Sequence, residues 1–366
     1  MLLQAFLFLL AGFAAKISAH HHHHHPPSPP SDDDDKSVAV YDPPVINTFH
    51  QCDPAAHVWK HDPNTVYVYG SHDVNSTKNP PVQYDMKDYY VLIQVDITKP
   101  ATVGPKILDL PDIPWASQQL WAPDVAEKNG EYFLYFPAKD KDGVFRIGVA
   151  KSDKPDGKFK AEPSYIPGAY SIDPAILADD DGCYYMYFGG LWGGQLQAWP
   201  NNTLNTSAFG NISPSSGPAL GPRFAKLSAN MTHLATEPKE LVIYDKDGQV
   251  MQANSTRRYF EAPSINKVGN LYYLQYSTGT SHTIEIAVGK KPEGPFYWKS
   301  TLLQPVKGWT THESIVKFKG DWLLYYADAS LTGIDDLRNT KVRKLNFANG
   351  TFALAQPQPY TPFPSS

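Results

Sequence analysis

Acidic side chains recur at the start of strand-like segments along this chain of 366 residues, and the recurrence is the first sign of chemistry. Five segments open with polar or acidic residues, usually followed by Pro and then by a short apolar run. They read Cys52-Asp53-Pro54-Ala55-Ala56, Trp121-Ala122-Pro123-Asp124-Val125, Ile172-Asp173-Pro174-Ala175-Ile176, Glu261-Ala262-Pro263-Ser264-Ile265 and Thr311-His312-Glu313-Ser314-Ile315. Because clustered carboxylates repel one another, folds that gather them use them mainly for metal binding or for acid and base catalysis.

The register of these segments separates the acidic residues into two kinds. Asp53, Asp173 and His312 share one position, whereas Glu261 lies one residue earlier and has a longer side chain. Glycoside hydrolysis needs two carboxyl groups that face a bond from opposite sides, one to protonate the leaving oxygen and one to activate water. A third carboxylate near the acid can raise the pKa of that acid. For any single Asp before Pro, a turn cap is the alternative role.

An aromatic strand-like run follows each of the five segments, and pairing with this run is expected to hold the segment in place. Most of the runs come after a turn signal such as Asn129-Gly130 or Asp181-Gly182, which is typical of a β-hairpin. The runs are Val66–Gly70, Tyr132–Phe136, Tyr184–Phe188, Leu271–Tyr276 and Trp322–Tyr326. Five such units predict an all-β fold, a single five-bladed β-propeller domain over residues 37–366. A two-sheet sandwich is the alternative, but it leaves the recurring acidic starts unexplained.

In a propeller the innermost strands line a central channel, and their starts meet at one mouth. The acidic starts are therefore expected to converge although they lie far apart in the sequence. The residues expected at this mouth are Asp53, Asp124, Asp173, Glu261, His312 and Glu313. His72 and Asp73, near a blade edge, are expected to be structural.

The ordered motifs resemble those of glycoside hydrolase family 43, the five-bladed β-xylosidases and α-L-arabinofuranosidases. The matching motifs are Asp53-Pro54-Ala55, Trp121-Ala122-Pro123-Asp124, Ser171-Ile172-Asp173-Pro174-Ala175 and Phe260-Glu261-Ala262-Pro263-Ser264. The resemblance implies that Asp53 is the general base, that Glu261 is the general acid, and that Asp173 tunes the pKa of the acid and orients the sugar. It also implies a reaction with inversion and no organic cofactor.

Further site residues are expected around these three. Trp121, Trp192 and Tyr259 could stack on apolar sugar faces, with blade packing as the alternative, and Asp124 is assigned to substrate binding with them. The resemblance implies that Arg338 contacts sugar hydroxyls, against the alternative of surface pairing. It further implies that His312 helps to hold a structural calcium ion in the central channel through water.

The resulting functional hypothesis is a secreted, exo-acting glycosidase that releases terminal xylose, and possibly also α-L-arabinofuranose, from xylo-oligosaccharides or arabinoxylan. A primary α-L-arabinofuranosidase or an endo-arabinanase is the alternative within the same chemistry. A propeller lectin without catalysis and a structural secreted propeller are alternatives from other classes. The oligomeric state is not indicated.

Export is expected from residues 1–19, an apolar leader with a small-residue cleavage pattern. His20–His25 resembles a purification tag, and Asp32–Lys36 an engineered protease site. Acceptor sequences for N-glycosylation occur at Asn75, Asn201, Asn205, Asn211, Asn230, Asn254 and Asn349. The net charge of −5 gives no reason to bind nucleic acid or an anionic membrane. Cys52 and Cys183 could form a disulfide or remain buried thiols.

Overall fold

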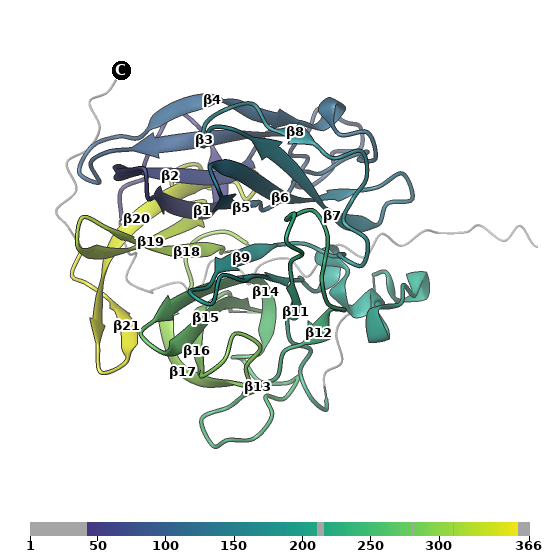
Figure 1. Ribbon diagram of the computed structural model, residues 1–366, viewed down its shortest axis with the longest axis vertical. Helices are drawn as coiled ribbons and strands as arrows, with labels where there is room; N and C mark the ends of the chain where they lie inside the picture. The colour runs from purple at the N-terminus through teal and green to yellow at the C-terminus, as the bar shows by residue number, and fades with distance from the viewer. Residues whose placement is uncertain (1–41, 211–215, 280, 310, 358–366) are drawn as a thin grey trace, which may run out of the picture. The chain divides into compact units, whose positions relative to one another are not determined.

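Antiparallel sheets make up the computed structural model, which describes residues 42–210, 216–279, 281–309 and 311–357 (Figure 1). The first sheet contains β1 (Gln51–Trp59), β2 (Asp62–His72), β3 (Asp88–Gln94) and β4 (Thr102–Asp109). The second contains β5 (Asp124–Lys128), β6 (Glu131–Lys139), β7 (Phe145–Ser152) and β8 (Lys160–Ala161). The third contains β9 (Ala175–Ala178), β10 (Tyr184–Phe188), β11 (Arg223–Lys226) and β12 (Lys239–Glu240). Residues 1–41 and Asn211 lie outside the described ranges, so the expected leader, tag and protease site are not part of this description.

The fourth and fifth sheets follow the same order, with one addition. The fourth contains β14 (Tyr259–Val268), β15 (Leu271–Thr278), β16 (Ile284–Gly289) and β17 (Phe296–Leu303), and β13 (Ile243–Tyr244) pairs with β17 in parallel. The fifth contains β18 (Glu313–Phe318), β19 (Asp321–Asp328), β20 (Asn339–Ala348) and β21 (Thr351–Leu354). The short 3-10 helices are η2 (Leu110–Asp112), η3 (Trp192–Gly194), η4 (Leu196–Ala198), η5 (Pro200–Asn202) and η6 (Thr206–Ala208). All five aromatic runs fall within second strands, as the sequence predicted.

The innermost strands close a ring. β1, β5, β9, β14 and β18 contact one another in that cyclic order, with β18 against β1. The sheets are therefore the blades of a five-bladed propeller, which confirms the predicted fold and excludes the sandwich. Among the described residues, no helix is long and apolar enough to span a lipid bilayer.

A polar seam joins the first and last blades. The backbone amide of Val45, just before β1, donates to the carbonyl of Thr340 in β20 at 2.8 Å. The carboxylate of Asp42 accepts hydrogen bonds from Arg343 Nε at 2.9 Å and from the Tyr326 hydroxyl at 2.8 Å. Because these partners come from opposite ends of the sequence, the seam holds the ring closed.

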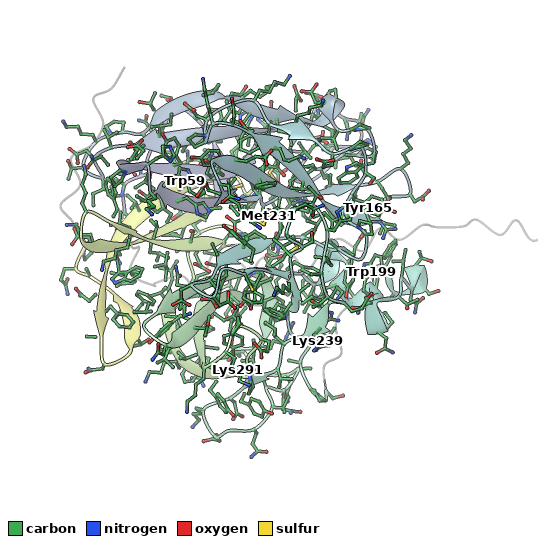
Figure 2. The ribbon with its side chains drawn as sticks, viewed as in Figure 1. Trp59, Tyr165, Trp199, Met231, Lys239 and Lys291 are labelled. Carbon is green, nitrogen blue, oxygen red and sulfur yellow. The ribbon has the colours of Figure 1, made fainter. Side chains whose placement is uncertain are left out.

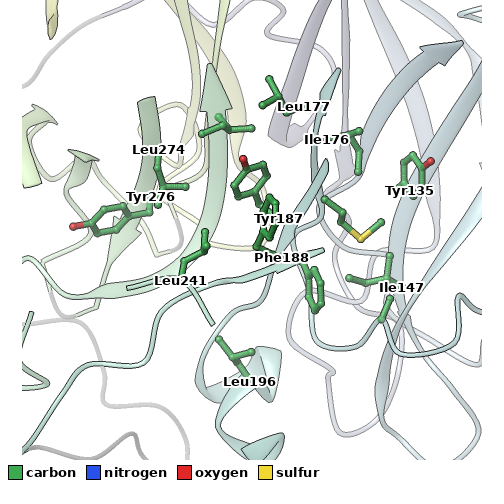
Figure 3. Packing of buried hydrophobic residues seen from close by; sticks show 14 of the residues in the cluster. Tyr135, Ile147, Ile176, Leu177, Tyr187, Phe188, Leu196, Leu241, Leu274 and Tyr276 are labelled. Carbon is green, nitrogen blue, oxygen red and sulfur yellow. The ribbon is translucent and has the colours of Figure 1, made fainter. Parts of the chain in front are cut away.

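Aromatic side chains fill the space between blades, which explains why the second strands are rich in Tyr and Phe. Figure 3 shows Tyr135, Tyr187 and Tyr276 among aliphatic neighbours of the largest core cluster. The hydroxyls of these three residues donate to backbone carbonyls, that of Tyr135 to Met231, that of Tyr187 to Pro292 and that of Tyr276 to Arg257, at 2.7, 2.7 and 2.9 Å. These rings therefore bury large apolar surfaces without leaving a polar atom unpaired.

The third blade carries the long insertion between β10 and β11. Trp199 of this insertion, labelled in Figure 2, stacks on Tyr170 with ring centroids 4.2 Å apart. The Tyr170 hydroxyl also donates to Asn202 Oδ1 at 2.5 Å. The insertion is thus packed onto its blade, and its first residues pass close to the acidic starts described next.

Candidate active site

Three blades present their acidic segments through the same unusual backbone conformation. Asp53, Asp173 and Ala262, which share one aligned position, have φ values of 52°, 56° and 56°. The pairing of β1 with β2 and of β14 with β15 is irregular at these points. A bulge of this kind re-aims side chains at the end of a strand, and non-glycine residues keep a positive φ mainly where the surrounding structure enforces it. Residues that share one position in the aligned segments thus also share one backbone conformation.

Asp53 is buried and held by donors on both carboxylate oxygens. Its Oδ1 accepts from the guanidinium of Arg338 at 3.2 Å, and its Oδ2 accepts from the Ser71 hydroxyl at 2.7 Å and from the Cys52 thiol at 3.3 Å. Burial alone would raise the pKa of Asp53, but Arg338, His312 and these donors together lower it. These contacts therefore stabilise the anionic form of Asp53, which is the form that a general base must have.

Arg338 is only 2% exposed and is bound chiefly by Asp73. Its Nε lies 2.9 Å from Asp73 Oδ2, and its second terminal nitrogen lies 3.0 Å from Asp73 Oδ1. The guanidinium also lies over the ring of Tyr84, 4.8 Å from its centroid. The structure therefore excludes surface pairing for Arg338, while the predicted contact with a sugar stays a prediction.

Glu261 and Asp173 have the opposite electrostatic environment. Burial, then the charges of Asp173 and Asp53, raise the pKa of Glu261 well above its usual range. Burial and the charge of Asp53 likewise raise the pKa of Asp173. Glu261 Oε1 is buried and has no hydrogen-bond partner among the described residues. The mouth thus places Asp53, whose pKa is lowered, together with two carboxyl groups whose pKa values are raised.

Asp124 lies in the central channel and is occupied by structural contacts. Its Oδ1 is 2.6 Å from His57 Nε2, and its Oδ2 accepts from the backbone amide of Ile176 at 2.6 Å. These contacts join the innermost strands of the first three blades. Its oxygens thus hold strands together, and the assignment of Asp124 to substrate binding stays a prediction.

His312 and Glu313 line the same channel, in a cavity of about 240 Å³. Burial lowers the pKa of His312, against the raising effect of Asp53. Burial raises the pKa of Glu313 to about 8, and its carboxyl oxygens are buried. Among the residues that the structure describes, no group of three or more His, Cys, Asp or Glu side chains is placed to hold a metal ion. The side chains do not form a protein cage for calcium, so the channel ion stays a prediction.

The predicted aromatic residues differ in accessibility. Trp121 and Trp192 are partly exposed. Trp121 donates its indole N–H to the carbonyl of Tyr84 at 2.9 Å, and Trp192 stacks on Trp309 with ring centroids 5.9 Å apart. Tyr259 is 1% exposed and belongs to the core, where its hydroxyl donates to the carbonyl of Gly189. The expected sugar stacking by Tyr259 is therefore wrong, because its ring is buried in the core and packs against Tyr276.

Sequence reasoning missed several residues that contact Asp53, Arg338 or Trp192. Asp73 was expected to be structural only, and Ser71, Tyr84 and Trp309 were not considered. Nothing in their local sequence distinguishes them, since Ser71 lies near the end of β2 and the others lie outside the strands. A strand-end Asp paired with a distant Arg would be visible only from the folded arrangement.

The remaining sequence features have plain structural outcomes. Cys52 and Cys183 are both free thiols, with Cys52 buried at the mouth and Cys183 part-buried beside β10. The six acceptor asparagines within the described ranges are all exposed, namely Asn75, Asn201, Asn205, Asn230, Asn254 and Asn349.

Comparison with known proteins places these features in context. The sequence profile described as glycosyl hydrolases family 43 matches residues 41–352. Xylosidase/arabinosidase 43A of Humicola insolens is 47% identical over 314 residues, which cover 82% of this chain and 95% of that protein. A xylosidase/arabinosidase of Bacteroides ovatus is 44% identical over 304 residues, 81% of this chain and 92% of that protein.

Solved structures of similar fold also belong to proteins described as enzymes of this family. One is a β-xylosidase/α-arabinofuranosidase from a compost microbial metagenome, solved with xylotriose in a calcium-free form. It has a TM-score of 0.80 and 44% identity, and the match covers 86% of this chain and 97% of that one. A Xanthomonas citri enzyme complexed with xylose has the same TM-score and identity and covers 86% and 92%.

Proposed function

This chain belongs to glycoside hydrolase family 43 and is a glycosidase, and from that premise we propose that it releases terminal xylose from xylo-oligosaccharides with inversion at the anomeric carbon. The observation that carries the proposal is the opposite protonation of two carboxyl groups in one mouth. Asp53 has a lowered pKa, whereas Glu261 has a raised one. A binding protein has no need of this difference, which therefore favours catalysis over a lectin.

Asp53 acts as the general base in this proposal. Its anion, held by Arg338 and Ser71, takes a proton from a water molecule that attacks the anomeric carbon. Because the water adds from the side opposite the leaving group, the new hydroxyl has inverted configuration. No covalent intermediate forms, and Asp53 returns its proton to solvent afterwards.

Glu261 acts as the general acid. Its proton, retained because burial and neighbouring carboxylates disfavour the anion, passes to the glycosidic oxygen as the bond to the sugar breaks. Asp173 supports this role by its negative field and by accepting the backbone amide of Ala262 at 2.9 Å. Asp173 thereby both fixes the position of Glu261 and favours its protonated form.

Xylose is the favoured sugar because xylosidase activity recurs in the names of the most similar relatives. An α-L-arabinofuranosidase is the second candidate, since two of these names carry both activities. Hydrolysis of aryl β-xylosides, aryl α-arabinofuranosides, xylotriose and linear arabinan would test the proposal. Higher kcat/KM on the xylosides supports it, and preferential cleavage of arabinan would overturn it.

Two further expectations complete the proposal. Export as a glycoprotein is supported by the apolar leader and by the exposure of the described acceptor asparagines, and mass analysis after deglycosylation of secreted material would test it. A structural calcium ion near His312 rests on the family resemblance. Chelator treatment with metal analysis would test it, and such an ion would take most of its oxygen ligands from water.

A further inference from the structure

We propose that Asp73 is a positioning residue for the reaction, which fixes the orientation and basicity of Asp53 through Arg338 and Cys52. This inference rests on the proposed role of Asp53 as the base. Asp73 itself is 2% exposed and has no place in the chemistry described above. Its carboxylate is nevertheless the centre of the hydrogen-bond network on which Asp53 depends.

The first connection runs through Arg338. Asp73 Oδ2 accepts from both the backbone amide and Nε of Arg338, at 2.7 and 2.9 Å, and Oδ1 accepts from a terminal nitrogen at 3.0 Å. Because Asp73 binds the backbone amide, Nε and a terminal nitrogen of Arg338, the planar guanidinium is held in a single orientation. In that orientation its other terminal nitrogen lies 3.2 Å from Asp53 Oδ1.

The second connection is the thiol of Cys52. Its sulfur lies 3.1 Å from Asp73 Oδ1 and 3.3 Å from Asp53 Oδ2. A thiol carries one proton, so it donates to one carboxylate at a time and bridges the two. Burial, against the opposing effect of Arg338, raises the pKa of Cys52, and both carboxylates add to this rise. The thiol therefore keeps the proton that it shares.

The network spans the closure of the ring. Asp73 directly follows β2 in the first blade, and Arg338 directly precedes β20 in the last, 265 residues away. The orientation of Asp53 is consequently set only when these two blades meet. The site and the polar seam therefore both join the first blade to the last, through different contacts.

The sign of each effect on Asp53 follows from charge. Asp73 competes for Arg338 and is itself negative, so neutralising it should lower the pKa of Asp53. The thiol stabilises the Asp53 anion, so removing it should raise that pKa. The other titratable or charged groups whose fields reach Asp53 stay constant in both cases; they are His312, Asp173, Glu261 and Tyr89.

The pH dependence of kcat/KM on an aryl glycoside, measured in two variants, tests the inference. Activity is lost at acid pH as Asp53 gains a proton, so the acidic limb reports its pKa. Asp73→Asn should move this limb to lower pH, and Cys52→Ala should move it to higher pH, each by roughly 0.5–1 unit. Cys52→Ser, which restores a donor, should return the limb close to its original position.

Matched variants separate this role from simple packing. Asp88→Asn removes a carboxylate that binds His72 and Lys106 outside the network, and Cys183→Ala removes the other thiol. Both should leave the limb in place. The inference would be overturned if the acidic limb of the profile did not move in Asp73→Asn and Cys52→Ala, or if it moved in the same direction in both variants.

Two further readouts keep the test decisive. If Asp73→Asn does not fold, as judged by thermal unfolding, the shift expected in Cys52→Ala and its absence in Cys52→Ser still support or overturn the inference. Failure of the proposed function shows differently. Full turnover in Glu261→Gln would remove the proposed mechanism, whereas the limb shifts can be measured on any glycoside that the chain hydrolyses.

Discussion

Asp173 in the third blade accepts a hydrogen bond of 2.9 Å from the backbone amide of Ala262 in the fourth, the residue that directly follows Glu261. One carboxylate is therefore fixed beside another by a main-chain contact between blades. Such a contact holds the two groups together whether or not they repel. The arrangement explains how a raised pKa at Glu261 can be maintained in the free protein.

Asp173→Asn should lower the pKa of Glu261, because it removes the largest neighbouring charge that raises that pKa. Activity is lost at alkaline pH when the acid loses its proton, so the alkaline limb of the pH–rate profile should move to lower pH. A pH series of kcat/KM on an unactivated xyloside measures this. An alkaline limb that does not move would leave Asp173 a purely structural hydrogen-bond acceptor.

Glu261→Gln should reduce turnover on substrates with poor leaving groups by about 10²- to 10⁴-fold, the usual contribution of general acid catalysis. The loss should be smaller on dinitrophenyl xyloside, whose leaving group needs no proton. The ratio of the two losses is the measurement. Equal losses on both substrates would exclude proton donation by Glu261.

The anomer released first reports the mechanism of Asp53. If water adds while Asp53 takes its proton, a β-xyloside should release α-xylose, which proton NMR detects before mutarotation. Inverting enzymes hold their two carboxyl groups roughly 6.5–9.5 Å apart to admit this water. Initial release of β-xylose, or transfer of xylose to methanol, would instead indicate a covalent intermediate.

Asp42→Ala should destabilise the propeller by about 3–5 kcal/mol, because it leaves the buried guanidinium of Arg343 without its carboxylate. The comparison variant is Asp321→Ala, which removes an exposed partner of Lys344 and should cost at most about 1 kcal/mol. Urea unfolding of both variants measures the difference. Similar losses would show that the seam contributes no more than a surface ion pair.

Trp192→Ala should raise KM for xylotriose by roughly 2- to 10-fold with little change in stability, since its ring is partly exposed beside Trp309. Tyr259→Phe should lower the stability and leave KM nearly unchanged, because the buried hydroxyl of Tyr259 donates to the carbonyl of Gly189 in the core. Steady-state kinetics and thermal unfolding on the same preparations separate the two. A KM effect confined to Tyr259→Phe would contradict the placement of both rings.

The propeller was predictable from the sequence because its signals are local. Each hairpin turn and aromatic run lies within a few residues, and five repetitions of one pattern leave few other architectures. Asp53 and Asp173 could be singled out for the same reason, since a shared register in a repeat implies a shared position in space, and Glu261 stood out because it lies one residue earlier. The positive φ common to Asp53, Asp173 and Ala262 was not predictable, because it arises from strand pairing.

The tertiary structure alone decided which of the other residues matter. Tyr259 and Trp192 look alike as aromatic residues near acidic motifs, yet one lies under a neighbouring blade and the other at the mouth. Nothing in the sequence near Asp73 or Arg338 indicates that they pair, and they meet because the first blade closes against the last. Periodicity reports which face of a strand is apolar, whereas contacts between distant segments depend on how the strands pack, and the sequence pattern does not encode that packing locally.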